Sequence, residues 1–215
     1  MITALQATDR LQWQDTFDSM FRLRYEVFIK RLGWPLRASN GREIDQFDHD
    51  WAHYLVLRNA DEEVVASCRM TPTSQPNLLG DIYPHLVQTG PVPSADDVWE
   101  VSRVAVDHDR ERLALLPDAL NPTGALFCAM FEYAMFVGAH TLVSVSDPAI
   151  ERILKMSGWK LRQLGPVIEL PEGGTAVAES AAVSQEQLAA IRRRTRTPHA
   201  VLEPMPSVPA LRRAA

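Results

Sequence analysis

Hydrophobic residues recur with two different spacings along the first half of the chain, and each spacing predicts its own kind of element. Over residues 9–32 large apolar side chains return every three or four positions, as on one helix face, and the Gly-Trp-Pro run at 33–35 ends the pattern. Residues 53–58, 63–70 and 98–106 are strand-like, because they are short runs rich in β-branched and apolar side chains. The first half therefore predicts one helix followed by three strands.

The second half adds helices in different surroundings. Residues 123–138 are apolar nearly all round, which predicts a helix buried between other elements. We expect a strand at 141–146, a helix capped by Asp147, a strand-like stretch at 159–170 and a last helix that begins with a capping box at Ser184. This order predicts a mixed α/β fold with one sheet and helices on its faces.

Three segments between these elements are predicted to be loops, at residues 35–50, 71–97 and 107–122. The first two exceed the usual length of a connection, and loops of that size are often functional. Large side chains become sparse near the end of the chain, where four prolines follow one another closely. We therefore expect a single domain over residues 1–196 and a proline-rich tail over 197–215 that lacks a core of its own.

The composition supports a folded domain and disfavours one large class of proteins. Apolar residues make up 46% of the 215 positions and charged residues 23%, which is enough for one sizeable core. The net charge of −5 disfavours a nucleic-acid binder. The charge is uneven, since residues 1–100 hold 15 acidic and 9 basic side chains and the remainder holds 12 and 13, so a local basic face is expected only in the second half.

Cysteine usage and the start of the chain bear on the compartment. Cys68 and Cys128 provide neither a disulfide framework nor a metal cluster, and they suit a reducing environment. The opening MITALQATDRLQWQD lacks the regions of a signal peptide, and no stretch approaches the ~18 uncharged apolar residues of a membrane span. We expect a cytoplasmic protein with neither membrane nor nucleic acid as a partner.

The first cluster of candidate functional residues combines an arginine with two aromatic residues. Arg24 and Phe28 are four residues apart and share a helix face, and Trp34 follows where the chain leaves that helix. Aromatic rings beside a guanidinium can hold a flat, cationic or carboxylate-bearing ligand. The alternative is that both aromatics belong to the core and that Arg24 pairs with a carboxylate.

The second cluster is Asp45 and Asp48 in the long loop, which could bind a ligand amine or an arginine. An ordinary solvated acidic loop is the alternative. Nearby, His49 and His53 are four apart but cross a loop-to-strand boundary and lack the zinc-helix signature, so no metal site is expected. The basic run at 192–196 is interpreted as a solvated helix end.

The third cluster lies on the strand predicted at 98–106. Glu100 and Ser102 are expected on one face of that strand, and Val101 and Arg103 on the other. Buried polar groups need partners, because an unpaired one costs about 1–3 kcal/mol. Arg69, on a neighbouring strand, could pair with the loop carboxylates or with Glu100. A purely structural network is the alternative to a catalytic site.

The order and spacing of the three clusters are far more specific than any one cluster. In chain order the residues are Arg24, Phe28, Trp34, Asp45, Asp48, Arg69, Glu100, Ser102 and Arg103. With the strings FRLRYEVF, GREIDQFDHD, EVSRVAV and ILKMSGW, they resemble the acyl-homoserine-lactone synthases, the autoinducer synthases of bacterial quorum sensing. The resemblance extends from about residue 10 to about residue 170.

The resemblance implies a fold and a reaction. It implies a GNAT-like three-layer α/β/α sandwich with a splayed mixed sheet and a thioester in the cleft. It also implies S-adenosylmethionine as the acyl acceptor and an acyl-thioester as the donor, both of them substrates, so no separate cofactor is expected. The products would be an acyl-homoserine lactone and methylthioadenosine.

The resemblance also assigns roles to the residues of the three clusters. It makes Glu100, Ser102 and Arg103 the catalytic set, with Glu100 as the base for the attacking amine. A backbone N–H where this strand splays would stabilise the oxyanion. Phe28 and Trp34 would line the nucleoside and sulfonium pocket. The ion-pair network that orders the loop would consist of Arg103 and the remaining substrate-binding residues, namely Arg24, Asp45, Asp48 and Arg69.

Two further assignments concern the acyl donor. Met130, Leu142 and Ser144 are expected to line the acyl pocket, and Arg152 with Lys155 would dock an acidic acyl carrier protein. The chain lacks the Gly-rich pyrophosphate loop with which many GNAT enzymes bind coenzyme A. This favours the carrier protein, although acyl-coenzyme A is the alternative donor.

Two other functions stay open from the sequence. One is a different GNAT-like N-acyltransferase, which would share the fold but would not need Phe28, Trp34 and the acidic loop. The other is a non-catalytic ligand sensor on the same scaffold, which an intact Glu100 and a complete ion-pair network disfavour. Release of methylthioadenosine separates the synthase from both.

Overall fold

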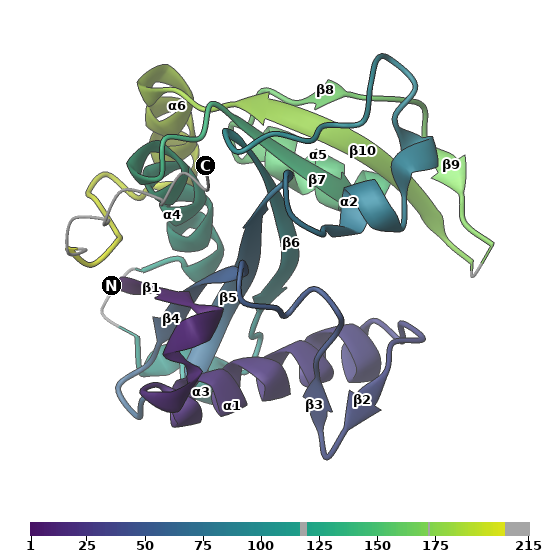
Figure 1. Cartoon of the computed structure of the whole chain (residues 1–215). Coiled ribbons are helices and arrows are strands. Elements are labelled where there is room, and N and C mark those ends of the chain that lie inside the picture. Colours follow the sequence, from purple (N-terminus) through teal and green to yellow (C-terminus); the bar gives the residue numbers. More distant parts are fainter. Residues whose placement is uncertain (117–119, 172, 205–215) are drawn as a thin grey trace, which may run out of the picture.

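An eight-stranded mixed sheet crosses the molecule, with helices on both of its faces (Figure 1). The computed structural model describes residues 1–116, 120–171 and 173–204. The strands are β1 (Ile2–Gln6), β2 (Ala38–Ser39), β3 (Arg42–Glu43), β4 (His53–Arg58), β5 (Val64–Pro72), β6 (Val98–Val106), β7 (Thr141–Ser146), β8 (Arg162–Gln163), β9 (Ile168–Glu169) and β10 (Thr175–Ala182). The α-helices are α1 (Gln14–Arg24), α2 (Leu78–Asp81), α3 (Arg110–Ala114), α4 (Pro122–Phe136), α5 (Pro148–Met156) and α6 (Gln185–Thr195). The 3-10 turns η1 (Ala7–Leu11) and η3 (Pro84–Leu86) and the π-helix η2 (Tyr25–Arg31) complete the helical elements of the described ranges.

The strands follow the order β1-β4-β5-β6-β7-β10-β8, with β9 also pairing with β10, while β2 and β3 form a separate hairpin. Neighbours in the large sheet are antiparallel except for β6 and β7, which are parallel. That parallel pairing joins Val98–Glu100 to Thr141–Val143 and ends there. The sheet therefore splays between β6 and β7, as the family resemblance implies, directly after Glu100.

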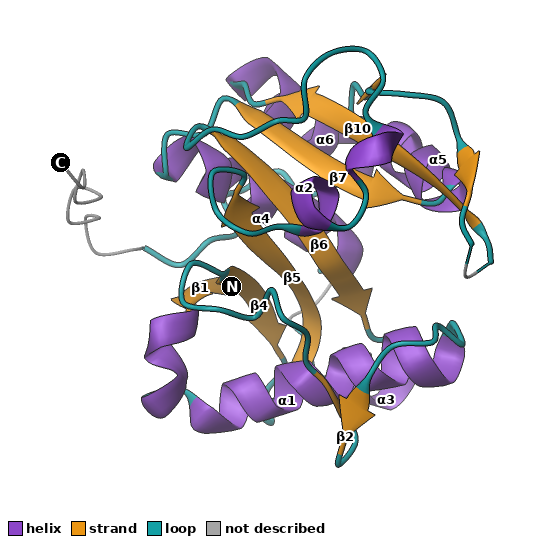
Figure 2. Cartoon of the chain, turned by 45° about the vertical axis from the view of Figure 1, so that its right-hand side comes forward, coloured by secondary structure: helices purple, strands orange, loops and turns teal. Residues whose placement is uncertain are grey.

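Helices cover both faces of the sheet (Figure 2). The buried apolar side chains form three separate clusters. On one face, α4 packs between the sheet and α6, which explains why its sequence is apolar on every side. On the other face, α1 buries Phe17 and Met20 against the half of the sheet that contains β4. Farther along that second face, Leu79 of α2 packs against Val143 of β7. The predicted three-layer α/β/α arrangement is confirmed.

Most of the predicted elements are confirmed, and two are confirmed only in part. The helix predicted at 9–32 consists of a 3-10 turn, the α-helix α1 and the π-helix η2 in succession. The stretch 159–170 is mostly irregular and contributes only β8 and β9, because its centre passes against the backbone of another segment. A Cβ at Gly165 would lie 2.2 Å from the carbonyl oxygen of Leu86.

The predicted loops hold short elements that the pattern did not indicate. Residues 35–50 contain the β2–β3 hairpin, and 71–97 contain α2 and η3. Residues 107–122 contain α3 and the start of α4. Apart from α4, each of these elements is too short to develop a hydrophobic period.

Two strands of the sheet were not predicted. β1 and β10 are strands, although β10 consists largely of alanine with a glutamate and a serine, which are poor strand formers. The segment after α6 also reaches the sheet, since the N–H of Ile2 donates to the carbonyl of Val201 at 2.7 Å and the N–H of Glu203 donates to the carbonyl of Ile2 at 2.9 Å. The rest of the predicted tail, 205–215, lies outside the described residues.

No helix within the described ranges is both long enough and apolar enough to cross a membrane.

Candidate active site

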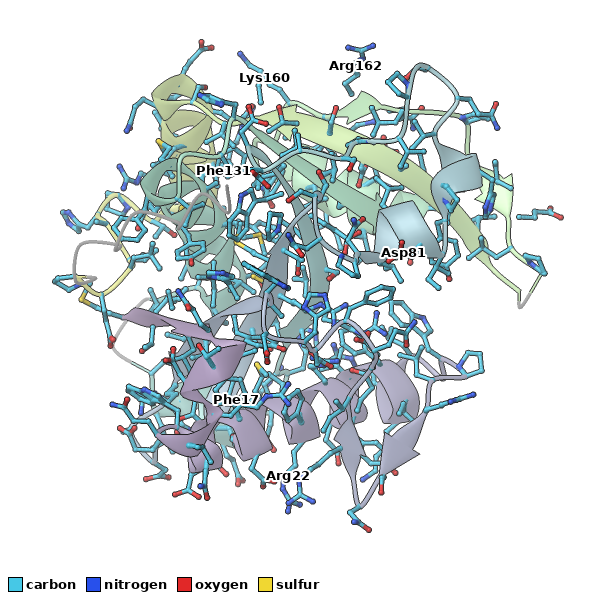
Figure 3. All side chains as sticks on the ribbon, in the orientation of Figure 1. Phe17, Arg22, Asp81, Phe131, Lys160 and Arg162 are labelled. Carbon is cyan, nitrogen blue, oxygen red and sulfur yellow. The ribbon has the colours of Figure 1, made fainter. Side chains whose placement is uncertain are left out.

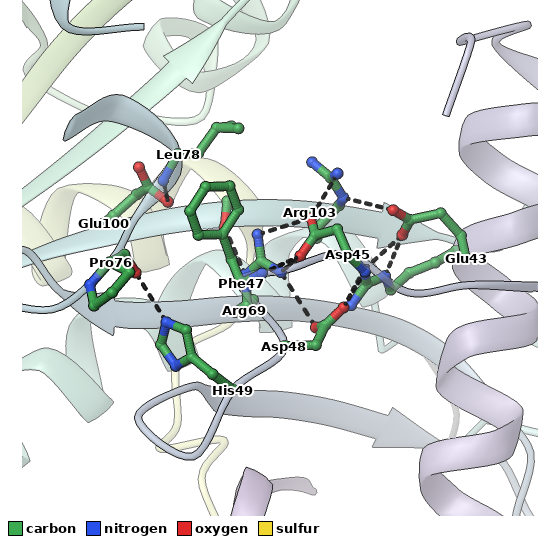
Figure 4. A network of polar contacts seen from close by, with 12 residues as sticks. Glu43, Asp45, Phe47, Asp48, His49, Arg69, Pro76, Leu78, Glu100 and Arg103 are labelled. Carbon is green, nitrogen blue, oxygen red and sulfur yellow. Dashed lines mark hydrogen bonds and ion pairs between the residues drawn. The ribbon is translucent and has the colours of Figure 1, made fainter. Parts of the chain in front are cut away.

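A buried network of ion pairs fills the space between the end of α1, the loop after β3, and strands β5 and β6 (Figure 4). Three arginines and three carboxylates alternate in it, so their formal charges cancel. The arginines are Arg24, Arg69 and Arg103, and the carboxylates are Glu43, Asp45 and Asp48. All of these except Glu43 were predicted to act together, and the structure brings them together.

Asp48 is the centre of this network. Its two carboxylate oxygens accept from the terminal nitrogens of Arg24 at 2.8 and 2.9 Å, and one of them also accepts from Arg69 at 3.2 Å. The Tyr54 hydroxyl donates to Asp48 at 2.8 Å, and so does the backbone N–H of Asp45. Burial acts to raise the pKa of Asp48, but the charge and hydrogen bonds of Arg24 and the charge of Arg69 outweigh it and hold the pKa well below its usual range.

The acidic loop owes its shape to its own carboxylates. Asp45 accepts from the backbone N–H of Phe47 at 2.8 Å, while Asp48 accepts from the backbone N–H of Asp45. Asp45 also accepts from Arg69 at 2.6 Å and from Arg103 at 2.7 Å. The loop is therefore held to strands β5 and β6 by arginine pairs rather than by an apolar core.

Glu43 is the member of the network that the sequence did not identify. Its carboxylate accepts from Arg24 at 2.6 Å and from Arg103 at 3.1 Å, and it is 1% exposed. Glu43 is the last residue of the β2–β3 hairpin. In the sequence, the signal that could have identified it was an acidic side chain two residues before Asp45. Glu43 therefore bridges Arg24, at the end of α1, and Arg103, on β6.

Arg103 lies on the face of β6 opposite to the one expected. The prediction placed it with Val101, away from Glu100 and Ser102, and this is wrong because β6 contains a bulge. The pairing of β5 with β6 shifts register at this point, and Arg103 adopts a left-handed backbone with φ of 52°. A bulge of this kind re-aims a side chain, and here it turns the Arg103 guanidinium into the network.

Phe28 and Trp34 stack on one another beside the network. Their ring centroids lie 5.1 Å apart with an interplanar angle of 8°, and the Arg103 guanidinium carbon lies 5.8 Å from the Phe28 ring. Phe28 is 2% exposed, whereas Trp34 is 41% exposed. The π-helical turn η2 and a left-handed Gly33 (φ 67°) bring the Trp34 N–H to the Phe28 carbonyl at 2.9 Å. The exposed ring is open to a ligand while the buried ring supports it.

Glu100 is buried on the same face of the sheet and is bound to the start of α2. Its two carboxylate oxygens accept from the backbone N–H groups of Leu78 at 3.1 Å and Leu79 at 2.6 Å. Burial raises the pKa of Glu100, and these two hydrogen bonds oppose that effect without cancelling it. Ser102, two residues on, accepts from Arg69 at 3.1 Å, which links the network to this strand.

One histidine joins the two loops that flank the site. The Nε2 atom of His49 lies 2.9 Å from the carbonyl oxygen of Pro76, just before α2 (Figure 4). His53 instead contacts Tyr133 and Trp99 in the interior, and burial lowers its pKa to about 4. In the described part of the chain no group of three or more histidine, cysteine or acidic side chains is arranged to hold a metal ion.

The residues predicted for the acyl pocket lie on the opposite face of the sheet from Glu100. Met130 of α4 and Leu142 of β7 belong to one buried apolar cluster. Ser144 lies two residues after Leu142 on the same face and is half-buried, and its hydroxyl lies 3.5 Å from a carboxylate oxygen of Glu179. Glu179 was not identified from the sequence.

The predicted docking residues lie on α5, at the surface. Arg152 is exposed, and the ammonium of Lys155 pairs with Glu151 at 2.6 Å. Lys160, from the same basic stretch, pairs with Glu186 at 2.7 Å, and it lies with Arg162 at the top of the view in Figure 3. Part of the positive charge expected there is therefore neutralised within the chain.

Comparison with known proteins gives one consistent group of relatives. The family model described as autoinducer synthase matches residues 8–191. An acyl-homoserine-lactone synthase from Acinetobacter nosocomialis is 34% identical over 145 residues, which cover 66% of this chain and 79% of that protein. The isovaleryl-homoserine lactone synthase of Bradyrhizobium diazoefficiens is 28% identical over 215 residues, 100% of this chain and 94% of that protein.

Solved structures agree with the sequence relatives. BjaI, a coenzyme A-dependent acyl-homoserine lactone synthase solved with S-adenosylmethionine and isopentyl-coenzyme A, superposes with a TM-score of 0.84 at 25% identity, covering 98% of this chain and 96% of BjaI. FeeM, an N-acyl amino acid synthase from uncultured soil microbes, shares only the fold, with a TM-score of 0.51 at 17% identity over 87% of this chain and 98% of FeeM.

The fold and these relatives first define a class, the acyltransferases with a GNAT-like α/β fold. Within that class, the chain belongs to the autoinducer synthase family and is an acyl-homoserine-lactone synthase.

Proposed function

We propose that this synthase binds S-adenosylmethionine between the stacked Phe28–Trp34 pair and the acidic loop. The observation that carries the proposal is the buried network centred on Asp48, in which Arg103 pairs with Asp45 of that loop and also lies 5.8 Å from the Phe28 ring of the pair. A sulfonium and a nucleoside suit an aromatic face. Asp45 is the carboxylate of the network with the greatest side-chain exposure, 11%, so it is the best placed to meet the ligand's amine.

In the first chemical step, the amine of S-adenosylmethionine attacks the thioester carbonyl and the thiolate leaves. The amine must be neutral to attack, and a free α-amino group titrates near ~7.7–8.0, so modest help from a base suffices. We assign this role to Glu100, which accepts the proton directly or through one water. Its raised pKa makes it a better base.

In the second step, the carboxylate of the methionine portion attacks its own γ-carbon, and methylthioadenosine leaves as the lactone closes. Because this step is intramolecular, the protein mainly has to hold the substrate in a folded geometry. The ion pairs of Arg24, Arg69 and Arg103 support that function, since they leave the loop little freedom to move.

For the donor we propose an acyl chain on acyl carrier protein, docked on the exposed face of α5 through Arg152 and Lys155. Ile150 and Ile153 on that helix are 43% and 46% exposed, which adds apolar surface beside the positive charge. Acyl-coenzyme A is the second candidate, and it is favoured by the overall similarity to BjaI. Under either donor we expect a cytoplasmic enzyme, since both substrates are products of cytoplasmic metabolism.

Purified protein tests the proposal when it is given S-adenosylmethionine with either hexanoyl-coenzyme A or hexanoyl-acyl carrier protein. We expect methylthioadenosine and an acyl-homoserine lactone with at least one donor. A higher kcat/KM with the carrier protein supports docking on α5, whereas a preference for the free coenzyme A thioester refutes it. Acylation of another amine without methylthioadenosine would refute the proposed use of S-adenosylmethionine.

A further inference from the structure

A second polar cluster lies beneath α5, on the face of the sheet opposite to the ion-pair network. At its centre is Glu179 of β10, which is 0% exposed and lies directly across from Ser144 of β7. One carboxylate oxygen, Oε1, accepts from the hydroxyls of Ser146 at 2.5 Å and Ser144 at 3.5 Å. The other oxygen, Oε2, is buried and has no hydrogen-bond partner among the described residues.

Burial is the main reason that Glu179 is close to protonation at neutral pH. Burial and the negative charge of Glu151 on α5 together raise the pKa of Glu179 to about 7, against the opposing effects of Ser146 and Lys155. Glu151 itself is held by Lys155 at 2.6 Å and by Gln163 at 2.9 Å. The Oε2 atom of Glu179 therefore serves as a donor or as an acceptor at neutral pH.

The position of this cluster relates it to the reaction. Strand β6 leaves β7 after the pairing of Glu100 with Val143, and Ser144 is the next residue along β7. Ser144 and Ser146 keep partial exposure while Glu179 is covered. Leu142, on the same face of β7, continues into the apolar cluster that contains Met130. A buried carboxylate with an unpaired oxygen thus lies beside Ser144, one of the residues expected to line the acyl pocket.

We propose that Glu179 is a specificity-determining residue that binds a hydroxyl group on the acyl chain of the donor. A hydroxyl both donates and accepts, so it pairs with Oε2 in either protonation state of Glu179. A plain alkyl chain leaves that oxygen buried and unpaired, and sites built to bind a substrate hydroxyl discriminate against analogues that lack it. This inference rests on the proposed function and adds a class of donor, the hydroxylated acyl-thioesters.

Matched pairs of donors test the inference. We would measure kcat/KM with S-adenosylmethionine and three pairs of acyl-thioesters, each on coenzyme A and on acyl carrier protein: 3-hydroxybutanoyl and butanoyl, 3-hydroxyoctanoyl and octanoyl, and 4-hydroxycinnamoyl and cinnamoyl. We expect the wild type to prefer the hydroxylated member of at least one pair by about tenfold or more. Glu179→Leu should abolish that preference by slowing the hydroxylated donor, whereas Glu179→Gln should largely retain it.

Controls separate this inference from the proposed function. Glu186→Gln, at an exposed carboxylate that pairs with Lys160, should leave the preference unchanged. Thermal unfolding checks each variant, and Glu179→Val replaces the leucine variant if that one misfolds. Equal kcat/KM within every pair, or a preference that survives loss of the carboxylate, overturns the role of Glu179 while the synthase activity stands. If no thioester releases methylthioadenosine on either coenzyme A or acyl carrier protein, the proposed function fails, and this inference fails with it.

Discussion

Replacing Asp48 with asparagine should destabilise the protein strongly, because no orientation of the amide satisfies the donors around it. One carboxylate oxygen accepts from Arg24, Arg69 and Tyr54, and the other accepts from Arg24 and the Asp45 N–H. In the Asp48→Asn variant an NH₂ group replaces one oxygen and faces at least two donors. Two arginines also lose a buried counter-charge.

The magnitude follows from the burial of these groups. Breaking a buried pair by removing one partner costs about 3–5 kcal/mol. For a domain of this size each kcal/mol lowers Tm by roughly 2–4 °C, so Tm should fall by about 6–20 °C. Urea unfolding at pH 7, followed by circular dichroism, gives the free energy of unfolding of both proteins.

The pH dependence gives an independent check with a fixed sign. Because the folded state holds the pKa of Asp48 below its unfolded value of ~3.9, this carboxylate contributes stability that is fully present above that value. The contribution is lost as the pH falls through the folded-state pKa. The difference between wild type and Asp48→Asn should therefore stay constant from about pH 5 to pH 7 and shrink below about pH 4.

A matched control is available on the surface. Asp18 also pairs with two arginines, Arg22 and Arg42, but its side chain is 35% exposed. Asp18→Asn should cost less than about 1 kcal/mol, as exposed ion pairs do. The reasoning is refuted if Asp48→Asn also stays within about 1 kcal/mol of the wild type.

Four further predictions concern activity. Glu100→Gln should leave a folded protein but lower the acylation rate by roughly 10²–10⁴-fold. Near-normal turnover at neutral pH would show that Glu100 is not the base and only holds α2 in place. Trp34→Ala should raise the KM for S-adenosylmethionine much more than that for the acyl donor, and equal effects on both would assign Trp34 a packing role alone. Ser144→Leu should shorten or redirect the lactones detected by mass spectrometry, whereas an unchanged profile would place Ser144 outside the pocket. The double change of Arg152 and Lys155 to glutamate should raise the KM for carrier-protein donors, most steeply at low salt, and should leave S-adenosylmethionine binding unchanged. Normal kinetics with the carrier-protein donor at low ionic strength would refute docking on α5.

The sequence was most informative where a period or a motif was long. The all-round apolar run at 123–138 predicted the buried helix α4, and the helix capped by Asp147 is also present. The two helices depend on local spacing, which a single sequence contains. The joint action of Arg24, Asp48 and Arg69 was implied instead by the family resemblance that the spaced clusters carry.

What the sequence did not reveal depends on the backbone or on distant partners. The bulge at Arg103 adds one residue to β6, and the alternation rule then assigns that side chain to the wrong face. Little in the sequence distinguishes Glu43, because only the folded β2–β3 hairpin places it between Arg24 and Arg103. Strand β10, with the buried Glu179, has the composition of a weak strand and forms through its pairing with β7.

The most direct test of the central claim is the stoichiometry of the products. With purified protein, S-adenosylmethionine and a donor that it accepts, we expect methylthioadenosine and acyl-homoserine lactone to appear together at a ratio of about one to one, since the lactone closes by expelling methylthioadenosine. Neither product should form when the acyl donor is omitted. Acylated S-adenosylmethionine that accumulates without methylthioadenosine, or methylthioadenosine released without a donor, would contradict the account.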